Sequence, residues 1–270
     1  MLRRNTFPTN LLCFCLLFLS SLGGTALARD DLRITGFGQD RFFLSDNSQP
    51  NGFAMVRDPA DASNRQKVYR FSVRPSQCIG GDCQQQSARS SLQQGNNVRQ
   101  PEEAWYGWDI YFPAGFPTGD RLISGLETFN EWKDQDQCDL VSLSITRGQR
   151  KLVWHMEAPT GKAMTQFGGD CRMVFEKPVA SVSDLVGSWH RFELFARWSG
   201  GADGRFVLYL DGKAKVDYSG RTCNENSARN YHLFGNYLCC TPDSTRIAES
   251  TVYYRFISRA SSRAGLKWGK

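Results

Sequence analysis

The sequence predicts an all-β protein built as a sandwich or jelly roll of two antiparallel sheets. Segments in which apolar and polar residues alternate recur along the chain, and Gly, Pro, Asp and Asn separate them. Aromatic residues make up 13% of the chain, with 25 Gly and 10 Pro, which suits many short strands joined by tight turns. No internal repeat interrupts this pattern, so one large β domain is expected.

The expected strands follow one another along the chain. Clean alternation starts at Tyr69 within residues 67–74. Asp211-Gly212 predicts a hairpin turn. The polar, Gln-, Ser- and Gly-rich residues 76–100 are expected to include a surface loop pinned by a disulfide, and residues 180–186 a short helix. The other expected strands are 105–112, 140–146, 151–156, 189–198, 205–210, 231–237 and 251–257.

The first 28 residues have the features of a secretory signal peptide. Arg3 and Arg4 precede an apolar run at 11–22, and Ala26-Leu27-Ala28 forms an A-x-A cleavage signal. The apolar run is shorter than the roughly 20 residues of a spanning helix. We therefore expect domain 29–270 to be exported, secreted or periplasmic, without a membrane anchor once the signal is cleaved.

The charge of the chain suits an anionic partner. The formal net charge of +6 falls to +4 when Arg3 and Arg4 leave with the signal. No long Lys/Arg run is present, which argues against nucleic acid. We expect a monomer.

Seven cysteines follow the signal, and in an exported chain they predict disulfides. Cys78–Cys83 closes the shortest loop. Cys138–Cys171 is the next proposal, followed by Cys223 with one of the neighbouring pair at 239 and 240, which leaves one thiol over. No pair of C-x-x-C knuckles is present, so a zinc site is not expected.

Several segments together resemble one enzyme family. Residues 231–238, Tyr-His-Leu-Phe-Gly-Asn-Tyr-Leu, resemble the Y-F-K-A-G-N-Y-L signature of jelly-roll polysaccharide lyases, which include alginate lyases and their heparin-lyase and glucuronan-lyase relatives. Residues 105–113, 189–199 and 208–213 resemble, in the family's order, its W-Y-x-F-x-x-Y-x-P, W-H-x-F…W-S and V-W-L-D-G-K strands. The resemblance implies a concanavalin-like β-jelly-roll.

The resemblance also implies β-elimination on a uronic-acid polysaccharide. That reaction needs a group that stabilises the uronate carboxylate, a base for the C5 proton and an acid for the leaving oxygen. In this family a strand Tyr serves as the acid, in some members also as the base, and the motif assigns this role to Tyr237. Period-two geometry places Tyr231, Gly235 and Tyr237 on one face, where Gly235 would let a sugar ring approach.

The chain departs from the family at the cations. Leu233 stands in place of the signature Lys. Arg89, in a segment that resembles the family's R-S-E-L but lacks its Glu, is a candidate to grip the uronate carboxylate. By order, the family's Gln/His strand falls near residue 130, where no His is present. The candidate substrate-binding residues are therefore Asn130, Glu131 and Lys133, together with Tyr231 on the signature strand.

The three histidines of the chain receive different expectations. His155 shares the wetter face of its strand with Glu157 and is the candidate general base. His190 is expected to be structural, and His232 faces away from Tyr237 and should pack internally.

Two other functions stay open at this point. Glu127 and Glu131 match the outer pair of the E-x-D-x-E strand of laminarinase-type glycoside hydrolases, but Phe129 replaces the middle Asp. A carbohydrate-binding module without activity is the second alternative, since this fold also hosts lectins. No cofactor is expected, and a structural calcium ion is left open.

Overall fold

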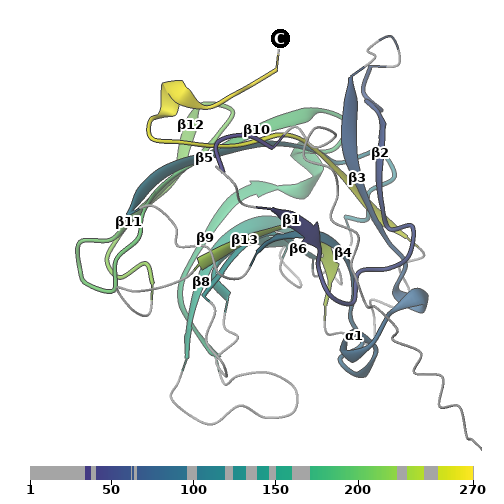
Figure 1. The fold of residues 1–270 in the computed structure, drawn as a ribbon, viewed down its shortest axis with the longest axis horizontal. Helices are drawn as coiled ribbons and strands as arrows, with labels where there is room; N and C mark the ends of the chain where they lie inside the picture. Colours follow the sequence, from purple (N-terminus) through teal and green to yellow (C-terminus); the bar gives the residue numbers. More distant parts are fainter. Residues whose placement is uncertain are drawn as a thin grey trace, which may run out of the picture.

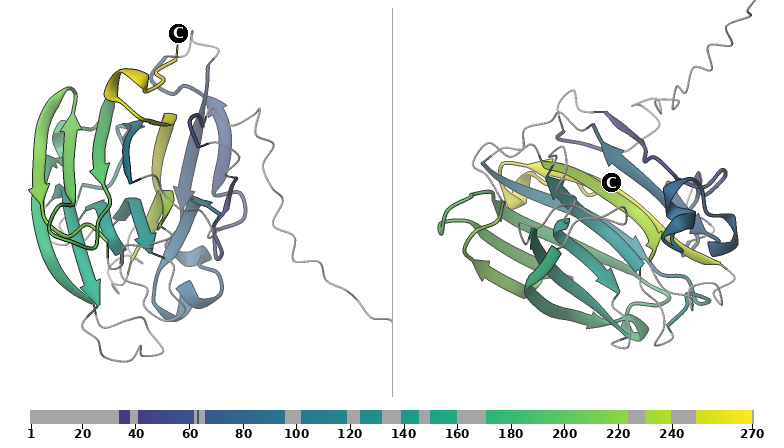
Figure 2. Two further views of the ribbon diagram at one scale, coloured as in Figure 1. Left: turned by 60° about the vertical axis from the view of Figure 1, so that its left-hand side comes forward. Right: turned by 90° about the horizontal axis from the view of Figure 1, so that it is seen from below.

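The computed structural model describes residues 34–37, 41–61, 63, 66–95, 102–118, 124–131, 139–145, 150–159, 171–223, 230–239 and 249–269. These residues form two antiparallel sheets that lie face to face (Figures 1 and 2). The all-β prediction is therefore confirmed. The expected signal peptide lies outside the described residues. Within them, no helix is long and apolar enough to cross a bilayer.

Each sheet has seven strands in the described part of the chain. In spatial order, the first sheet contains β1 (Phe42–Leu44), β4 (Ala88–Gln94), β13 (Asn230–Leu238), β6 (Ser124–Glu131), β7 (Asp139–Ile145), β8 (Lys151–Pro159) and β9 (Cys171–Ser181). The second contains β12 (Lys213–Ser219), β11 (Arg205–Leu210), β10 (Trp189–Arg197), β5 (Glu103–Tyr111), β14 (Ser250–Ala260), β3 (Lys67–Val73) and β2 (Phe53–Arg57). Short helical turns are α1 (Gly81–Gln84), η1 (Pro75–Gln77), η2 (Val182–Asp184) and η4 (Arg263–Gly265).

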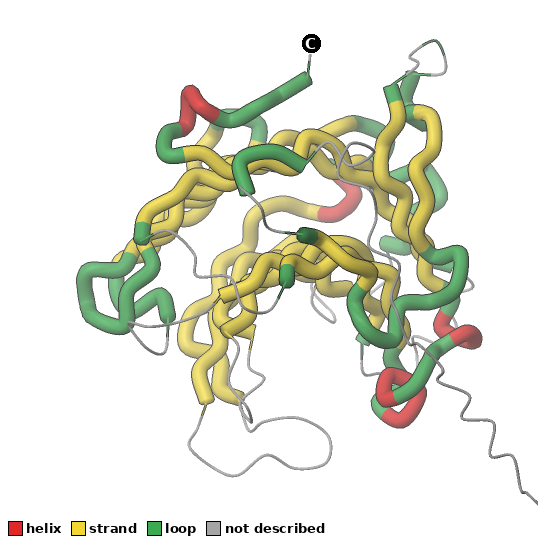
Figure 3. Tube along the Cα trace, viewed as in Figure 1, coloured by secondary structure: helices red, strands yellow, loops and turns green. Residues whose placement is uncertain are grey.

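Both sheets arch in the same sense, so their outer faces differ in shape (Figure 3). The first sheet turns a concave face outward, with α1 at one side and β8 and β9 at the other (Figure 1). We call it the concave sheet. The second sheet turns its convex face outward, and the C-terminal residues pass over that face; we call it the convex sheet.

Large aromatic side chains fill the space between the sheets. The inward positions of β5 are Tyr106, Trp108 and Ile110, all fully buried. Phe192 of β10 stacks on Trp108 with ring centroids 5.8 Å apart. Because successive side chains of a strand point to opposite faces, filling one face with aromatics commits the alternate residues to the outer face.

Most sequence predictions for local structure are confirmed. Each predicted strand corresponds to an observed strand, and Asp211 and Gly212 have positive φ angles of 50° and 77° between β11 and β12, as a type I′ turn requires. The predicted helix at 180–186 is only the 3₁₀ turn η2.

The disulfide-pinned loop expected within residues 76–100 is present, closed by Cys78–Cys83, but the same stretch also contains a strand that the sequence pattern did not predict. Residues 88–94 form β4, a largely buried strand of the concave sheet. Its buried positions include Ser90, Ser91 and Gln94. Because these buried side chains are small or polar, the apolar alternation that marks the other strands is weak here.

The cysteine predictions have mixed outcomes. The disulfide Cys78–Cys83 is present, with Cα atoms 5.1 Å apart. Cys171 and Cys239 are also disulfide-bonded, and Cys138, the predicted partner of Cys171, lies outside the described residues. The predicted pairing of Cys223 is wrong, because Cys223 is a buried thiol. It follows the end of β12 by four residues.

His232 belongs to the core, as expected. It is 1% exposed and stacks on Phe129, with ring centroids 4.4 Å apart and planes 7° apart. Burial, with a smaller contribution from the charge of Arg259, lowers the pKa of His232 to about 3. The ring is therefore neutral in the folded protein at all but strongly acidic pH.

We predict that His232 makes the protein sensitive to acid. Between about pH 6.5 and pH 3 the unfolded chain binds a proton here and the folded chain does not, so stability falls as the pH falls. The limiting slope for one proton is about 1.4 kcal/mol per pH unit. His232→Phe should remove it. Urea unfolding at several pH values measures the difference, and identical pH slopes in both proteins would contradict the prediction.

Candidate active site on the concave sheet

Arg89 and Tyr237 lie opposite each other on neighbouring strands of the concave sheet. The even-numbered residues of β13 from His232 to Leu238 are buried between the sheets. The odd-numbered residues from Tyr231 to Tyr237 therefore belong to the outer face. In β4, the same rule commits Arg89 to that face. The register pairs Tyr237 with Arg89 directly, and the guanidinium carbon lies 4.6 Å from the centroid of the Tyr237 ring.

The Arg89 guanidinium is anchored by a buried carboxylate. Its Nε and Nη2 atoms each donate to Asp82, at 2.6 Å, in a two-pronged ion pair. Asp82 is 2% exposed. Burial opposes the charge of Arg89, but the hydrogen bonds and charge of Asp82 outweigh it, and the phenols of Tyr237 and Tyr231 add to this, so the pKa of Arg89 is raised.

The backbone of Tyr237 is shaped by two glycines. Gly235 has a φ of +148°, and a Cβ atom there would lie 2.4 Å from the carbonyl oxygen of Ser90. The close approach of β4 therefore requires a glycine at position 235. The sequence analysis had given a different reason for this glycine, the approach of a sugar ring. On the other side Tyr237 pairs with Gly125 of β6, where the register shifts. Its ring lies between a cation and a residue without a side chain.

For the substrate-binding candidates on β6, the structure gives the strand position only. Tyr231 pairs with Asn130, and Asn230 with Glu131, so Asn130 and Glu131 lie on β6 beside β13. Lys133 lies outside the described residues. Tyr231 is half-buried on the same face as Tyr237.

The structure does not bring His155 to Tyr237. His155 lies on the concave face of β8, and β6 and β7 separate β8 from β13. With strands about 4.8 Å apart, three steps across the sheet separate the backbones by about 14 Å. His155 is 7% exposed, its Nδ1 lies 3.1 Å from Ser144 Oγ, and burial lowers its pKa despite the charge of Glu176.

Sequence reasoning missed Asp82. It lies in the loop between Cys78 and Cys83, seven residues before its partner Arg89. A sequence signal did exist, because the short disulfide loop was expected and contains a single acidic residue. The direction of its side chain depends on how the loop folds back against β4.

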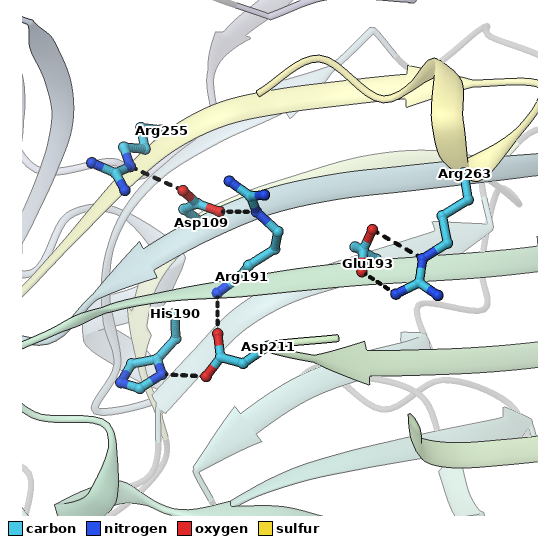
Figure 4. Close-up of polar contacts among 7 residues, drawn as sticks. All are labelled: Asp109, His190, Arg191, Glu193, Asp211, Arg255 and Arg263. Atoms are coloured by element: carbon cyan, nitrogen blue, oxygen red, sulfur yellow. Dashed lines mark hydrogen bonds and ion pairs between the residues drawn. The ribbon is translucent and has the colours of Figure 1, made fainter. Parts of the chain in front are cut away.

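The convex sheet carries a separate group of charged residues (Figure 4). We define the convex-face cluster as the seven residues drawn in Figure 4: Asp109, His190, Arg191, Glu193, Asp211, Arg255 and Arg263. All of them except His190 and Arg263 line an open pocket of about 400 Å³, together with Trp189 and Gly212.

The charges of the convex-face cluster compensate one another. Asp109, 2% exposed, accepts hydrogen bonds from Arg191 Nε at 3.2 Å and Arg255 Nε at 2.9 Å. Arg263 binds Glu193 with two hydrogen bonds. Asp211 lies 2.8 Å from His190 Nδ1. Each carboxylate already has a cationic or histidine partner, so we interpret the cluster as structural. His190, expected to be structural, belongs to it.

Metal ligands do not gather in the part of the chain that the structure describes. No group of three or more His, Cys, Asp or Glu residues is arranged there to hold an ion.

Comparison with known proteins identifies the family. The family model described as "Polysaccharide lyase" matches residues 44–258, most of the chain. This chain belongs to the polysaccharide lyase family. Of the functions that the sequence left open, the lyase is the one supported, and the family resemblance is confirmed. A search of curated proteins found no match to this lyase.

Solved structures share the fold of this polysaccharide lyase. An endo-β-1,4-glucuronan lyase from the fungus Trichoderma reesei has a TM-score of 0.57 at 14% identity, covering 82% of this chain and 95% of its own. Alginate lyase vAL-1 from Chlorella virus has a TM-score of 0.50 at 12% identity, covering 80% and 90%. At such identities the likeness shows the jelly-roll fold alone.

We predict that Asp109 stabilises the lyase without acting in turnover. Asp109→Asn leaves two guanidinium groups without their shared carboxylate, although Arg255 keeps its contact with Asp58. We expect a loss of about 3 kcal/mol in unfolding free energy, at the lower end for a broken buried ion pair. Urea unfolding measures it, with activity unchanged at temperatures where the variant is folded.

The matched control is Asp217→Asn, which breaks the exposed two-pronged pair with Arg205 and should leave the unfolding free energy nearly unchanged, because solvent screens the pair. Equal losses in the two variants would contradict a structural role for the cluster.

Proposed function

We propose that this lyase is secreted and cleaves a uronic-acid-containing polysaccharide by β-elimination, with Tyr237 as the proton-transferring residue. The observation that carries the proposal is the contact between Tyr237 and Arg89 on the concave face. A phenol beside a guanidinium can give up or take a proton while the cation stabilises negative charge. An anionic polysaccharide suits the positive net charge of the chain.

The proposed reaction breaks the C5–H and C4–O bonds and forms a C4=C5 double bond and an O–H bond. The C5 proton leaves the uronate, its electron pair forms the C4=C5 double bond, and the C4–O bond breaks. The departing glycosidic oxygen takes up a proton, so the products are a new chain end and an unsaturated sugar. Tyr237 is the acid that protonates this oxygen. Its phenolate form can first remove the C5 proton.

Arg89 is the proposed partner of the uronate carboxylate. Its Nε and Nη2 atoms donate to Asp82. The remaining nitrogen, Nη1, makes no bond to Asp82 and is the proposed donor to the substrate carboxylate. The side chain is 25% exposed, so a substrate can reach it. Arg89 thus takes over the charge that the family's Lys supplies at the position of Leu233 here.

We assign His155 to a different sugar of the polymer. The backbones of β13 and β8 are about 14 Å apart. His155 is therefore too far from Tyr237 to exchange a proton with the same uronate. A polysaccharide that crosses the strands of the concave sheet reaches β8 a few sugar units away from the broken bond. Ser144 and His155 would bind hydroxyl groups there.

Secretion is supported by the disulfides. Cys78–Cys83, together with the disulfide-bonded Cys171 and Cys239, favours an oxidising compartment, which agrees with the signal-like residues 1–28.

We predict that Tyr237→Phe abolishes most of the turnover. The purified chain is incubated with glucuronan, alginate and heparin-like polymers, and ultraviolet absorbance of the new double bond is followed. On the polymer that is cleaved, Tyr237→Phe removes only the hydroxyl and should lower kcat about 100-fold or more. Binding of the polymer, measured by affinity electrophoresis, should change little.

The matched control is Tyr253→Phe, the same substitution on the convex sheet, which should keep the wild-type rate. Wild-type cleavage by Tyr237→Phe would disprove the assignment. New reducing ends without any ultraviolet absorbance would show hydrolysis in place of elimination.

A further inference from the structure

Asp82 is a buried carboxylate that pairs with Arg89, the cation beside Tyr237. Its two oxygen atoms accept from Nε and Nη2 of Arg89 at 2.6 Å each. This arrangement holds the guanidinium in a fixed plane, because both prongs must be satisfied together. The plane that results lies over the Tyr237 ring.

The loop that carries Asp82 is closely tied down. The disulfide Cys78–Cys83 closes it, and Cys83 is the next residue after Asp82. The Asp82 backbone donates to the Ile79 carbonyl at 3.2 Å, and its carbonyl accepts from Ser87 at 2.8 Å. The carboxylate therefore cannot follow Arg89 if that side chain moves toward solvent.

The burial of Asp82 distinguishes the Asp82–Arg89 pair from an ordinary surface ion pair. A long, partly exposed arginine gains little from an ion pair at the surface, because solvent screens it and ordering the side chain costs entropy. Here the carboxylate is buried, and it orders Arg89 in the rotamer that covers Tyr237. Without that carboxylate the guanidinium is free to extend into water.

We propose that Asp82, held by the Cys78–Cys83 loop, is a positioning residue that keeps the Arg89 guanidinium against Tyr237. This inference rests on the proposed function for its role in turnover, but the geometry can be tested without substrate. The titratable groups that act on the Arg89 guanidinium are Asp82, Tyr237 and Tyr231, and of these Tyr237 lies directly against it. Gly125 of β6, on the other side, carries no side chain.

The test is an ultraviolet titration of the Tyr237 phenol. Subtracting the titration of a Tyr237→Phe protein isolates this one phenol among nine. Arg89→Met removes the cation and should raise the titration midpoint by about one pH unit. Asp82→Asn keeps the cation but releases it, so the midpoint should rise in the same direction by a smaller amount. Each variant is compared with its own Tyr237→Phe double variant.

Two further variants sharpen the result. Cys78→Ser with Cys83→Ser frees the loop without changing any charge and should also raise the midpoint, which keeps the test decisive if Asp82→Asn does not fold. Asp217→Asn, which breaks the distant pair with Arg205, should leave the midpoint unchanged. Asp82→Asn also removes a negative charge near Tyr237, which lowers the midpoint, so the variant with unchanged charge decides. A midpoint that stays or falls in Cys78→Ser with Cys83→Ser overturns the proposal, because the guanidinium would then be held without the closed loop.

Kinetics connects the geometry to turnover. On a cleaved polymer, Asp82→Asn should lower kcat about 10-fold with a smaller change in KM, and should cause no further loss in an Arg89→Met background. Additive losses would show that Asp82 acts independently of Arg89 and would overturn the positioning role. If no polymer is cleaved but the midpoints shift as expected, the proposed function fails and the positioning role stands.

Discussion

The placement of the candidate site depends on the buried amide of Asn236. It is fully buried, its nitrogen donates to the carbonyl and hydroxyl of Ser250 at 2.9 and 3.1 Å, and its oxygen accepts from Ser124 Oγ at 3.0 Å. Ser250 belongs to the convex sheet and Ser124 to the concave sheet. Slipping β13 by one residue would break all three bonds and reverse every side chain of the strand. Tyr237, the next residue, is thereby held on the outer face.

The two outer faces use charge in different ways. On the convex face, carboxylates and guanidinium groups neutralise one another within the cluster of Figure 4, and the C-terminal segment adds Arg263 and the Trp268 ring, which lies 3.8 Å from the Arg191 guanidinium carbon. On the concave face, the Arg89–Asp82 pair faces a phenol. A cation beside an ionisable hydroxyl can take part in proton transfer, whereas a closed ion-pair network mainly stabilises the fold.

Replacement of the family's Lys by Leu233 has a structural context. Leu233 is half-buried on the outer face of β13, between Gln93 of β4 and Thr128 of β6. It adds apolar surface to the concave face at a position where the family has a charge. Arg89 is the cation that the structure places on the neighbouring strand β4, where it pairs with Tyr237, four residue pairs beyond Leu233. In the proposed function, recognition of an anionic substrate and proton transfer would therefore both take place at one end of β13.

Alternation along the sequence predicted eight of the strands, their inward and outward faces and the burial of His232, because strand geometry is local and repeats every two residues. The resemblance to the family's signature strand indicated Tyr237, and the resemblance to its R-S-E-L segment indicated Arg89. Strand order was decided only by the tertiary structure. It paired Arg89 with Tyr237, placed His155 three strands away and brought Asp82 behind the guanidinium. These contacts join segments that are distant in sequence or depend on a folded loop, so no local pattern records them.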